Sequence, residues 1–439
     1  MNGPSPARSA IRGAATGIDS VALCIALLSA SAFFFLAFWT LHNGHLHEDA
    51  FILFTYAERL ASGDGIVYFS GGAPTEGATD FLWMALVALF AACNVDVAVA
   101  AAALNGLGLG IITYFAVHAL RWQSGAWPRM VVGLGLALLL LSSTITAASM
   151  GGFSAALYGA VSVILFQVYL TGSVAAIRWI PWIALLLGLI RPDGVVIGFL
   201  MCVLGLERAW RGPFRRRYIG FLLSASTLGA CYFVWRFSYF GQLFPLPFYV
   251  KTAGDELLPG LRTNIEYLKQ HATLVVVAAL ASAVVADRRR YVRAFVPFVF
   301  LLVALSCVHQ TQNIAYRFQA PVTAVLIVSL PLFLDRFLAQ EKSGTAVFVS
   351  LLAIVFVMGG NGFQSRRAYR ELTDEAYIDH FPFIASGIFT ADTTVALTEA
   401  GRMAYWTEAK TFDLVGLNTA EVARNTVSTD YLSRLEPDV

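Results

Sequence analysis

The sequence predicts an α-helical polytopic membrane protein. Only 13% of its 439 residues are charged and 58% are hydrophobic, whereas an ordinary soluble domain has roughly 25% charged residues. Long apolar runs recur along most of the chain, and too few polar residues are present to shield them from water. These observations exclude a conventional water-soluble enzyme. The net charge of +2 is also too small to indicate a nucleic-acid partner.

About eleven apolar runs are predicted to cross the membrane. The first follows a basic N-terminus with Arg8 and Arg12, but it is too long for a signal peptide and lacks a small-residue cleavage site before His42. We therefore expect a retained span there. The expected spans cover residues 18–41, 97–120, 129–147, 154–171, 178–190, 194–207, 218–240, 271–286, 293–308, 320–338 and 345–360. Residues 80–93 form a further run that is short for a span, and we interpret it as an interfacial helix because counting it as a span would move the later arginine clusters to the outer face.

The distribution of arginine tests this topology. Arginine and lysine concentrate in short cytoplasmic loops, and with the N-terminus inside, the dense clusters at 208–217 and 288–293 both lie on the cytoplasmic side. The same count leaves a first outer loop at 42–96 and a tail at 361–439 on the opposite face. The tail contains short alternating patches, so we expect a small extracytoplasmic α/β domain after a transmembrane domain at 1–360.

Nothing in the sequence predicts a disulfide framework or a metal site. The five cysteines lie singly in apolar runs without CxxC spacing, and we interpret them as small apolar side chains. His42, His45 and His47 lie close together, but we interpret them as polar interfacial residues and not as metal ligands. We expect no required cofactor, and assistance by a divalent cation stays an open alternative.

The most distinctive polar feature is the acidic pair Glu48 and Asp49, which comes shortly after the first span. Adjacent carboxylates at a membrane face are costly to leave unpaired, and one of them commonly acts as a base or binds a cation. A helix-period pattern follows the pair. It offers a simpler alternative, in which both acids only stabilise a helix N-terminus.

Three cations are predicted on the same face of the membrane as this pair. Arg191 interrupts a long apolar stretch, Lys251 ends an aromatic and proline-rich segment, and Arg317 lies at the mouth of a span. In the simpler alternatives Arg191 pairs with Asp193 in a plain turn and Lys251 only reaches the interface. Cations that face carboxylates at headgroup depth suit a lipid-linked phosphate whose sugar is displaced by a base-activated hydroxyl.

Four stretches in order resemble one family. They are the run from His47-Glu48-Asp49 to Trp83, LIRPDG at 189–194, WRFSYFGQLFPLPFYVK at 235–251 and YRFQAP at 316–321. The sequence thereby resembles bacterial integral-membrane glycosyltransferases of the GT-C type, and is similar to the mycobacterial terminal arabinofuranosyltransferases. The resemblance implies a GT-C fold and transfer of a sugar from a polyprenyl-phosphate donor to a hydroxyl on a cell-envelope glycan, lipid or protein. It also implies a site on the periplasmic face of the bacterial inner membrane.

The resemblance implies roles for individual residues. Asp49 would be the base that deprotonates the acceptor in an inverting transfer, with Glu48 assisting it. The residues expected to contact the donor phosphate are Arg191, Tyr249, Lys251 and Arg317. Those expected around the acceptor or elsewhere in the site are Glu76, Asp80, Asp193 and His309.

Some positions depart from the family pattern. The first acid of the pair is Glu48 where aspartate is common, Ser154 stands where relatives have a carboxylate, and His309-Gln310-Thr311 replaces Gly-Gly-Asp. The identities of the sugar and the acceptor therefore stay open. Two other classes of function also stay open, namely a transporter or flippase of a lipid-linked sugar, and a catalytically degenerate scaffold of the cell envelope.

Overall fold

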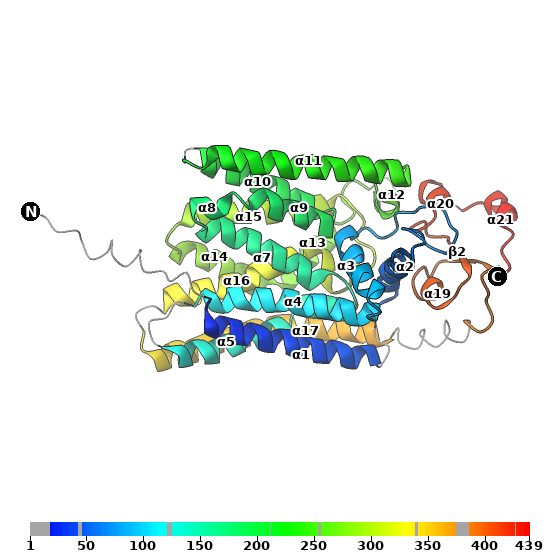
Figure 1. Ribbon diagram of the computed structural model, residues 1–439. Helices are drawn as coiled ribbons and strands as arrows, with labels where there is room; N and C mark the ends of the chain where they lie inside the picture. The colour runs from blue at the N-terminus through cyan, green and yellow to red at the C-terminus, as the bar shows by residue number, and fades with distance from the viewer. Residues whose placement is uncertain are drawn as a thin grey trace, which may run out of the picture.

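The computed structural model describes residues 18–42, 46–120, 125–210, 212–252, 256–338, 341–374, 386–425 and 427–439. Long helices lie side by side in a bundle, and a group of shorter elements covers one end of it (Figure 1). The bundle contains α1 (Ser20–His42), α4 (Val97–His118), α5 (Ala126–Leu141), α6 (Thr144–Met150), α7 (Ala155–Thr171), α8 (Val174–Ile177), α9 (Ile180–Ile190), α10 (Gly194–Trp210), α11 (Arg215–Phe240), α13 (Leu261–Gln270), α14 (Ala272–Val284), α15 (Arg288–Ser306), α16 (Ala320–Phe337) and α17 (Ser343–Asp374).

The outer surface of this bundle is apolar. Large side chains such as Phe35, Trp39 and Phe356 are more than two-thirds exposed, which suits a helix surface in contact with lipid. Within the described ranges, five helices are long and apolar enough to cross a membrane, or up to seven if the bent pairs α5–α6 and α13–α14 each form one span. The protein is therefore a multi-pass membrane protein by composition and helix length.

The predicted number of spans is not settled by these helices. A helix accompanies each of the eleven expected runs. However, α9 has only 11 residues and α14 has 13, whereas about 20 are needed to cross the hydrocarbon core without help. The figure of eleven stays a prediction.

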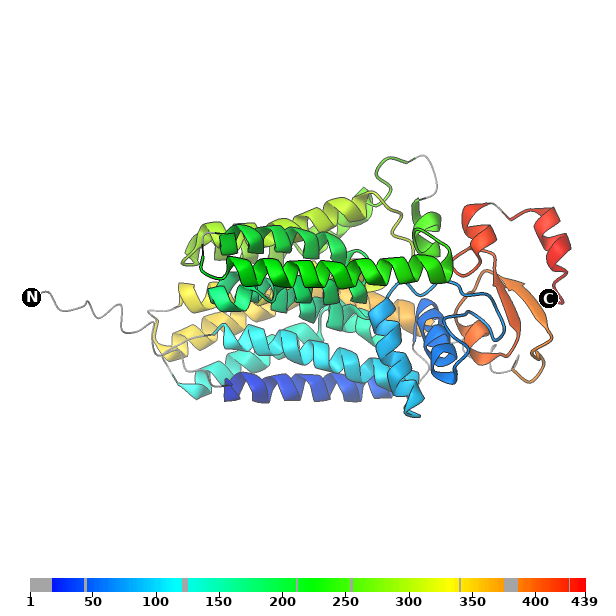
Figure 2. The same ribbon diagram turned by 45° about the horizontal axis from the view of Figure 1, so that its top comes forward.

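Two helices of the first loop cross the end of the bundle. They are α2 (Glu48–Ser62) and α3 (Phe81–Ala92), and they pack against each other (Figure 2). The second of them matches the shorter apolar run expected at 80–93. Because α3 begins directly after Asp80 and α2 begins at Glu48, both helices bring acidic residues to the same end of the molecule.

The tail forms a small α/β unit, as the sequence predicted. Strands β1 (Thr394–Leu397) and β2 (Lys410–Asp413) pair in parallel, with Thr394 opposite Lys410, and helix α19 (Arg402–Trp406) connects them. Two further short helices follow, α20 (Ala420–Arg424) and α21 (Thr429–Leu435). We call residues 386–439 the C-terminal unit. Helix α17 continues through the expected boundary at 360/361 and ends at Asp374.

Candidate functional site

The local structure of the acidic pair sends its two side chains in different directions. His47 caps α2, since its Nδ1 accepts a hydrogen bond from the backbone N–H of Asp49 at 3.1 Å. Acids in the first turn of a helix also stabilise the helix dipole, as the simpler interpretation expected, but each acid additionally pairs with an arginine. Successive residues of a helix point about 100° apart. Asp49 accordingly lines a cavity, whereas Glu48 faces the C-terminal unit.

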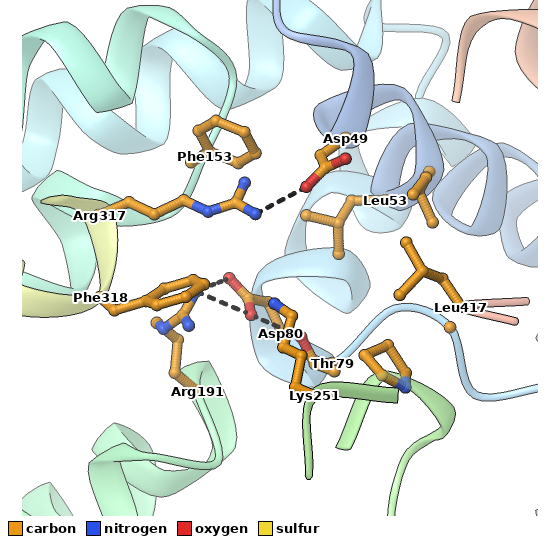
Figure 3. Close-up of a pocket in the computed structure, with 13 residues that line it drawn as sticks. Asp49, Leu53, Thr79, Asp80, Phe153, Arg191, Lys251, Arg317, Phe318 and Leu417 are labelled. Carbon is orange, nitrogen blue, oxygen red and sulfur yellow. Dashed lines mark hydrogen bonds and ion pairs between the residues drawn. The ribbon is translucent and has the colours of Figure 1, made fainter. Parts of the chain in front are cut away.

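The cavity lies where the first loop meets the bundle. Its five charged lining residues come from five separate segments: Asp49 from α2, Asp80 from the start of α3, Arg191 from the turn between α9 and α10, Lys251 from α12 (Leu246–Thr252) and Arg317 from the 3-10 helix η2 (Ile314–Gln319) (Figure 3). Its volume is about 70 Å³, which is room for about five water-sized groups. All five residues belong to the set predicted from the sequence.

Asp49 and Arg317 form an ion pair in this cavity. The Oδ2 atom of Asp49 lies 2.8 Å from a terminal nitrogen of Arg317, and the guanidinium group stacks 3.7 Å from the ring centre of Phe153. In the described part of the chain no hydrogen bond reaches the second oxygen, Oδ1 of Asp49. Asp49 is therefore a fixed carboxylate with one oxygen left for another partner.

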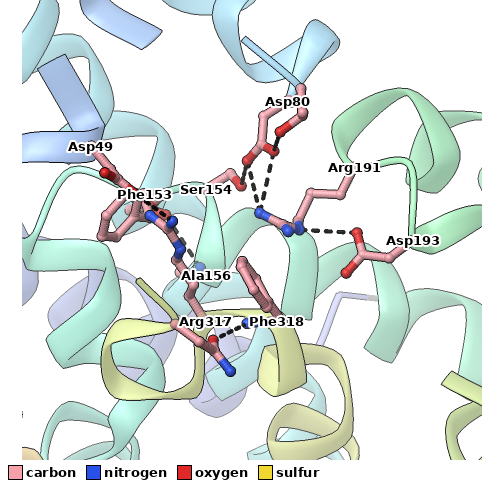
Figure 4. A network of polar contacts seen from close by, with 12 residues as sticks. Asp49, Asp80, Phe153, Ser154, Ala156, Arg191, Asp193, Arg317 and Phe318 are labelled. Carbon is pink, nitrogen blue, oxygen red and sulfur yellow. Dashed lines mark hydrogen bonds and ion pairs between the residues drawn. The ribbon is translucent and has the colours of Figure 1, made fainter. Parts of the chain in front are cut away.

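Both oxygens of Asp80, the second acid of the cavity, accept hydrogen bonds. Asp80 accepts hydrogen bonds at 3.1 and 3.2 Å from Arg191 and one at 2.6 Å from the hydroxyl of Ser154 (Figure 4). Arg191 also donates to Asp193 at 3.1 Å. The simple turn pairing of Arg191 with Asp193 is thus present, but the same arginine reaches the cavity and bridges two acids.

Lys251 differs from the other two cations. Among the described residues it has no carboxylate within ion-pairing distance, and its ammonium group lies 4.7 Å from the ring centre of Phe318. Burial lowers the pKa of Lys251 to about 8, and the nearby Arg317 acts in the same direction. Three cations and two carboxylates line the cavity, so its formal charge is +1 when Lys251 is protonated. This excess of positive charge favours an anion.

The other predicted site residues lie outside the set that lines the cavity. Glu76 forms a two-point ion pair with Arg236 of α11, both contacts at 2.6 Å. The hydroxyl of Tyr249 accepts from the backbone N–H of Phe244 at 3.3 Å. His309 donates its backbone N–H to the carbonyl of Lys251 at 2.9 Å.

Arg317 is supported by a cluster of amide side chains, which were not among the predicted site residues. The side chain of Gln319 donates to Asn264 at 2.8 Å and to Gln310 at 2.7 Å, and Asn313 donates to both glutamines at 2.9 Å. These bonds hold the segment in which Ala315 and Tyr316 adopt left-handed backbone angles, which non-glycine residues seldom do. The sequence did carry a signal for this cluster, because a run of amide side chains beside a membrane span requires hydrogen bonds within the protein.

The structure offers no clear metal site in its described part. Within the described ranges no three His, Cys, Asp or Glu side chains gather closely enough to hold an ion. Of the histidine group at the end of the first span, His47 serves as the helix cap, and His45 lies outside the described residues.

Comparisons with known proteins support the fold. Residues 379–439 match a family model described as a domain of unknown function (DUF8728), and no curated protein matches the sequence. Two crystal structures of ArnT from Cupriavidus metallidurans are similar to the chain, one bound to undecaprenyl phosphate and one in the apo state. Their TM-scores are 0.59 and 0.58, each at 14% identity, and each covers 93% of this chain and 90% of that chain. The chain therefore has the GT-C type fold.

Proposed function

We propose that the chain is a membrane glycosyltransferase that moves a sugar from a polyprenyl-phosphate donor to an acceptor hydroxyl. The observation that carries this proposal is the cavity, in which the open oxygen of Asp49 shares one small space with Lys251 and two arginines. A base and an anion-binding set are the two parts that displacement at a sugar phosphate requires. The fold adds support, because one similar structure of ArnT holds undecaprenyl phosphate.

In the proposed reaction Asp49 acts as the general base. Its Oδ1 atom takes the proton of the acceptor hydroxyl while the hydroxyl oxygen bonds to the anomeric carbon. The bond from that carbon to the phosphate oxygen breaks, and polyprenyl phosphate leaves with the bonding electron pair. Attack opposite the leaving group inverts the anomeric configuration. The ion pair with Arg317 fixes the carboxylate through Oδ2 and leaves Oδ1 for this proton.

Lys251 is the proposed primary contact of the donor phosphate. Arg191 already bridges Asp80 and Asp193, and Arg317 already holds Asp49. A bound anion would therefore be paired first with Lys251, and the two arginines add positive charge around it. A cavity of about 70 Å³ is close to the size of a phosphate group alone.

We place this site on the periplasmic side of a bacterial inner membrane. The support is the position of the arginine clusters, since Arg208 and Arg290 donate to carbonyls at the C-terminal end of α7. Ser154, at the N-terminal end of the same 17-residue helix, contacts the cavity acid Asp80. The two ends are separated by about 25 Å. If the arginine clusters face the cytoplasm, the cavity and the C-terminal unit face outward.

Reconstitution into liposomes with a labelled polyprenyl-phosphate sugar tests the function. Covalent transfer of the label to an added envelope acceptor is the expected result. Movement of the intact labelled lipid between leaflets without transfer would favour a flippase instead. Donor binding with neither movement nor transfer would point to a scaffold.

The sugar itself can be identified from the purified protein. We propose a pentose such as arabinofuranose, or a hexose, carried to a glycan, lipid or protein of the cell envelope. Mass spectrometry of the lipid that co-purifies with the protein would identify the headgroup. A sample containing only ordinary phospholipids, with no polyprenyl phosphate or its glycoside, would count against the proposed donor.

A further inference from the structure

Among the described residues, every hydrogen-bond partner of the Glu48 carboxylate lies in the C-terminal unit. Its Oε1 atom accepts the backbone N–H groups of Gly401 at 2.5 Å and Arg402 at 2.9 Å. Its Oε2 atom lies 2.9 Å from the guanidinium group of Arg402. The side chains of both partners are buried, with 9% and 1% of their surface exposed. Both carboxylate oxygens of Glu48 therefore bind the C-terminal unit, and Glu48 does not line the cavity.

Arg402 contacts residues on both sides of Asp49, in α2 and in the segment directly before this helix. Besides Glu48, it donates to the carbonyl of Leu46 at 2.6 Å, and its guanidinium group lies 5.5 Å from the ring centre of Phe51. One buried side chain thus links the residue before the helix cap to the first turn that carries Asp49. Arg402 does not itself line the cavity.

The fit between this segment and the C-terminal unit is close. A Cβ atom added to Gly401 would lie 1.9 Å from the carbonyl oxygen of Glu48, so only glycine permits this approach. The hydroxyl of Tyr56, further along α2, donates to Asn418 at 3.1 Å. Leu417 of the same unit lines the cavity itself. The C-terminal unit therefore forms part of the wall and also holds the helix that carries the proposed base.

We infer that Arg402 is a positioning residue for Asp49, acting through Glu48 and Leu46, so that the catalytic centre is complete only with the C-terminal unit in place. The inference rests on the proposed function of Asp49. Its physical basis is that removing one partner of a buried charge pair leaves the other charge uncompensated, which destabilises the segment that carries it. A displacement of about 1 Å at a reacting group can reduce a rate by about 100-fold.

The test compares Arg402→Gln, Glu48→Gln and the double variant in the transfer assay. We expect kcat to fall by about 100-fold in each single variant, while the KM for the donor changes little because Lys251 and Arg191 are untouched. The double variant should be no worse than either single one, since both remove the same pair. Arg402→Lys should recover part of kcat because it restores the charge.

Arg59→Gln is the matched control. Arg59 also joins α2 to the C-terminal unit, 3.6 Å from Glu408, but it is ten residues from Asp49 and its partner is exposed. We expect its kcat to equal that of the wild type. A wild-type kcat in Arg402→Gln, or full additivity in the double variant, would overturn the inference while leaving the proposed function standing.

A second readout does not depend on transfer. Hydrogen exchange of the backbone amides at 46–52 should be faster in Arg402→Gln than in the wild type. Exchange at 246–252, the segment that carries Lys251, should stay unchanged. Unchanged exchange at 46–52 would contradict the positioning role. If the wild type transferred no sugar, the proposed function would fail, and the exchange result would still decide whether Arg402 orders this turn.

Discussion

Ser154 donates a 2.6 Å hydrogen bond to the buried carboxylate of Asp80. This contact shows what the serine at this position does in the structure. The Oδ2 atom of Asp80 that receives this bond also pairs with Arg191 at 3.1 Å. A carboxylate in place of the hydroxyl would place a second negative charge beside Asp80 in a buried site.

We therefore predict that Ser154→Asp is more harmful than Ser154→Ala. The alanine variant loses one hydrogen bond to a charged group, and its free energy of unfolding should fall by about 1 to 3 kcal/mol. The aspartate variant should fall further because two acids then compete for Arg191. Thermal unfolding of both variants in the same detergent checks the order. Equal melting temperatures for wild type and Ser154→Asp would refute it.

The affinity for the donor should depend on pH through Lys251. Burial lowers the pKa of this lysine to about 8, so the ammonium form prevails at pH 7 and is lost as the pH rises through 8. The KM for the donor should accordingly rise above pH 8. Titration of initial rates against donor concentration between pH 6.5 and 9.5 measures this dependence.

Lys251→Arg and Lys251→Met provide the controls for this dependence. Arginine stays charged, so its KM should be flat over the same range. Methionine should raise KM by about 10- to 100-fold at pH 7, the worth of a charged hydrogen bond. A wild-type profile as flat as that of the arginine variant would exclude Lys251 as the titrating contact.

The stability of the protein should fall at acid pH through His47. Burial lowers the pKa of His47 to about 4, whereas an unfolded chain protonates histidine near pH 6.5. Below pH 6.5 His47 binds a proton in the unfolded state but stays neutral in the folded state. The free energy of unfolding therefore decreases as the pH falls, down to about pH 4. The full effect is at most about 3 kcal/mol.

His47→Asn isolates this contribution. Asparagine can accept the same capping bond from the Asp49 N–H, but it does not titrate. The variant should match the wild type at pH 7.5 and become the more stable of the two at pH 5. Melting curves at both values measure the difference, and parallel losses in the two proteins would rule out His47 as the cause.

The sequence was most informative where one physical rule dominates. Apolar runs predicted the helices, and scarce charges predicted that Asp49, Arg191, Lys251 and Arg317 share one end of the bundle. The run at 80–93 forms the 12-residue helix α3, and its interfacial position stays a prediction.

Pairings across the fold could not be predicted in the same way. Arg191 lies 111 residues from Asp80, and Arg402 lies 354 residues from Glu48. The sequence marks Arg191 as unusual, but nothing local in it identifies the partner of either arginine. It was equally hidden that Asp49 lines the cavity while Glu48 faces the C-terminal unit, because this depends on which face of α2 meets that unit.

In the proposed reaction Asp49 removes the proton of the acceptor. Single-turnover transfer from a saturating polyprenyl-phosphate sugar should be reduced at least about 1,000-fold in Asp49→Asn, while binding of the donor is retained. Glu58→Gln, which changes another acid of the same helix and keeps an acceptor for Tyr405, should react at the wild-type rate. A wild-type single-turnover rate in Asp49→Asn would exclude Asp49 as the base.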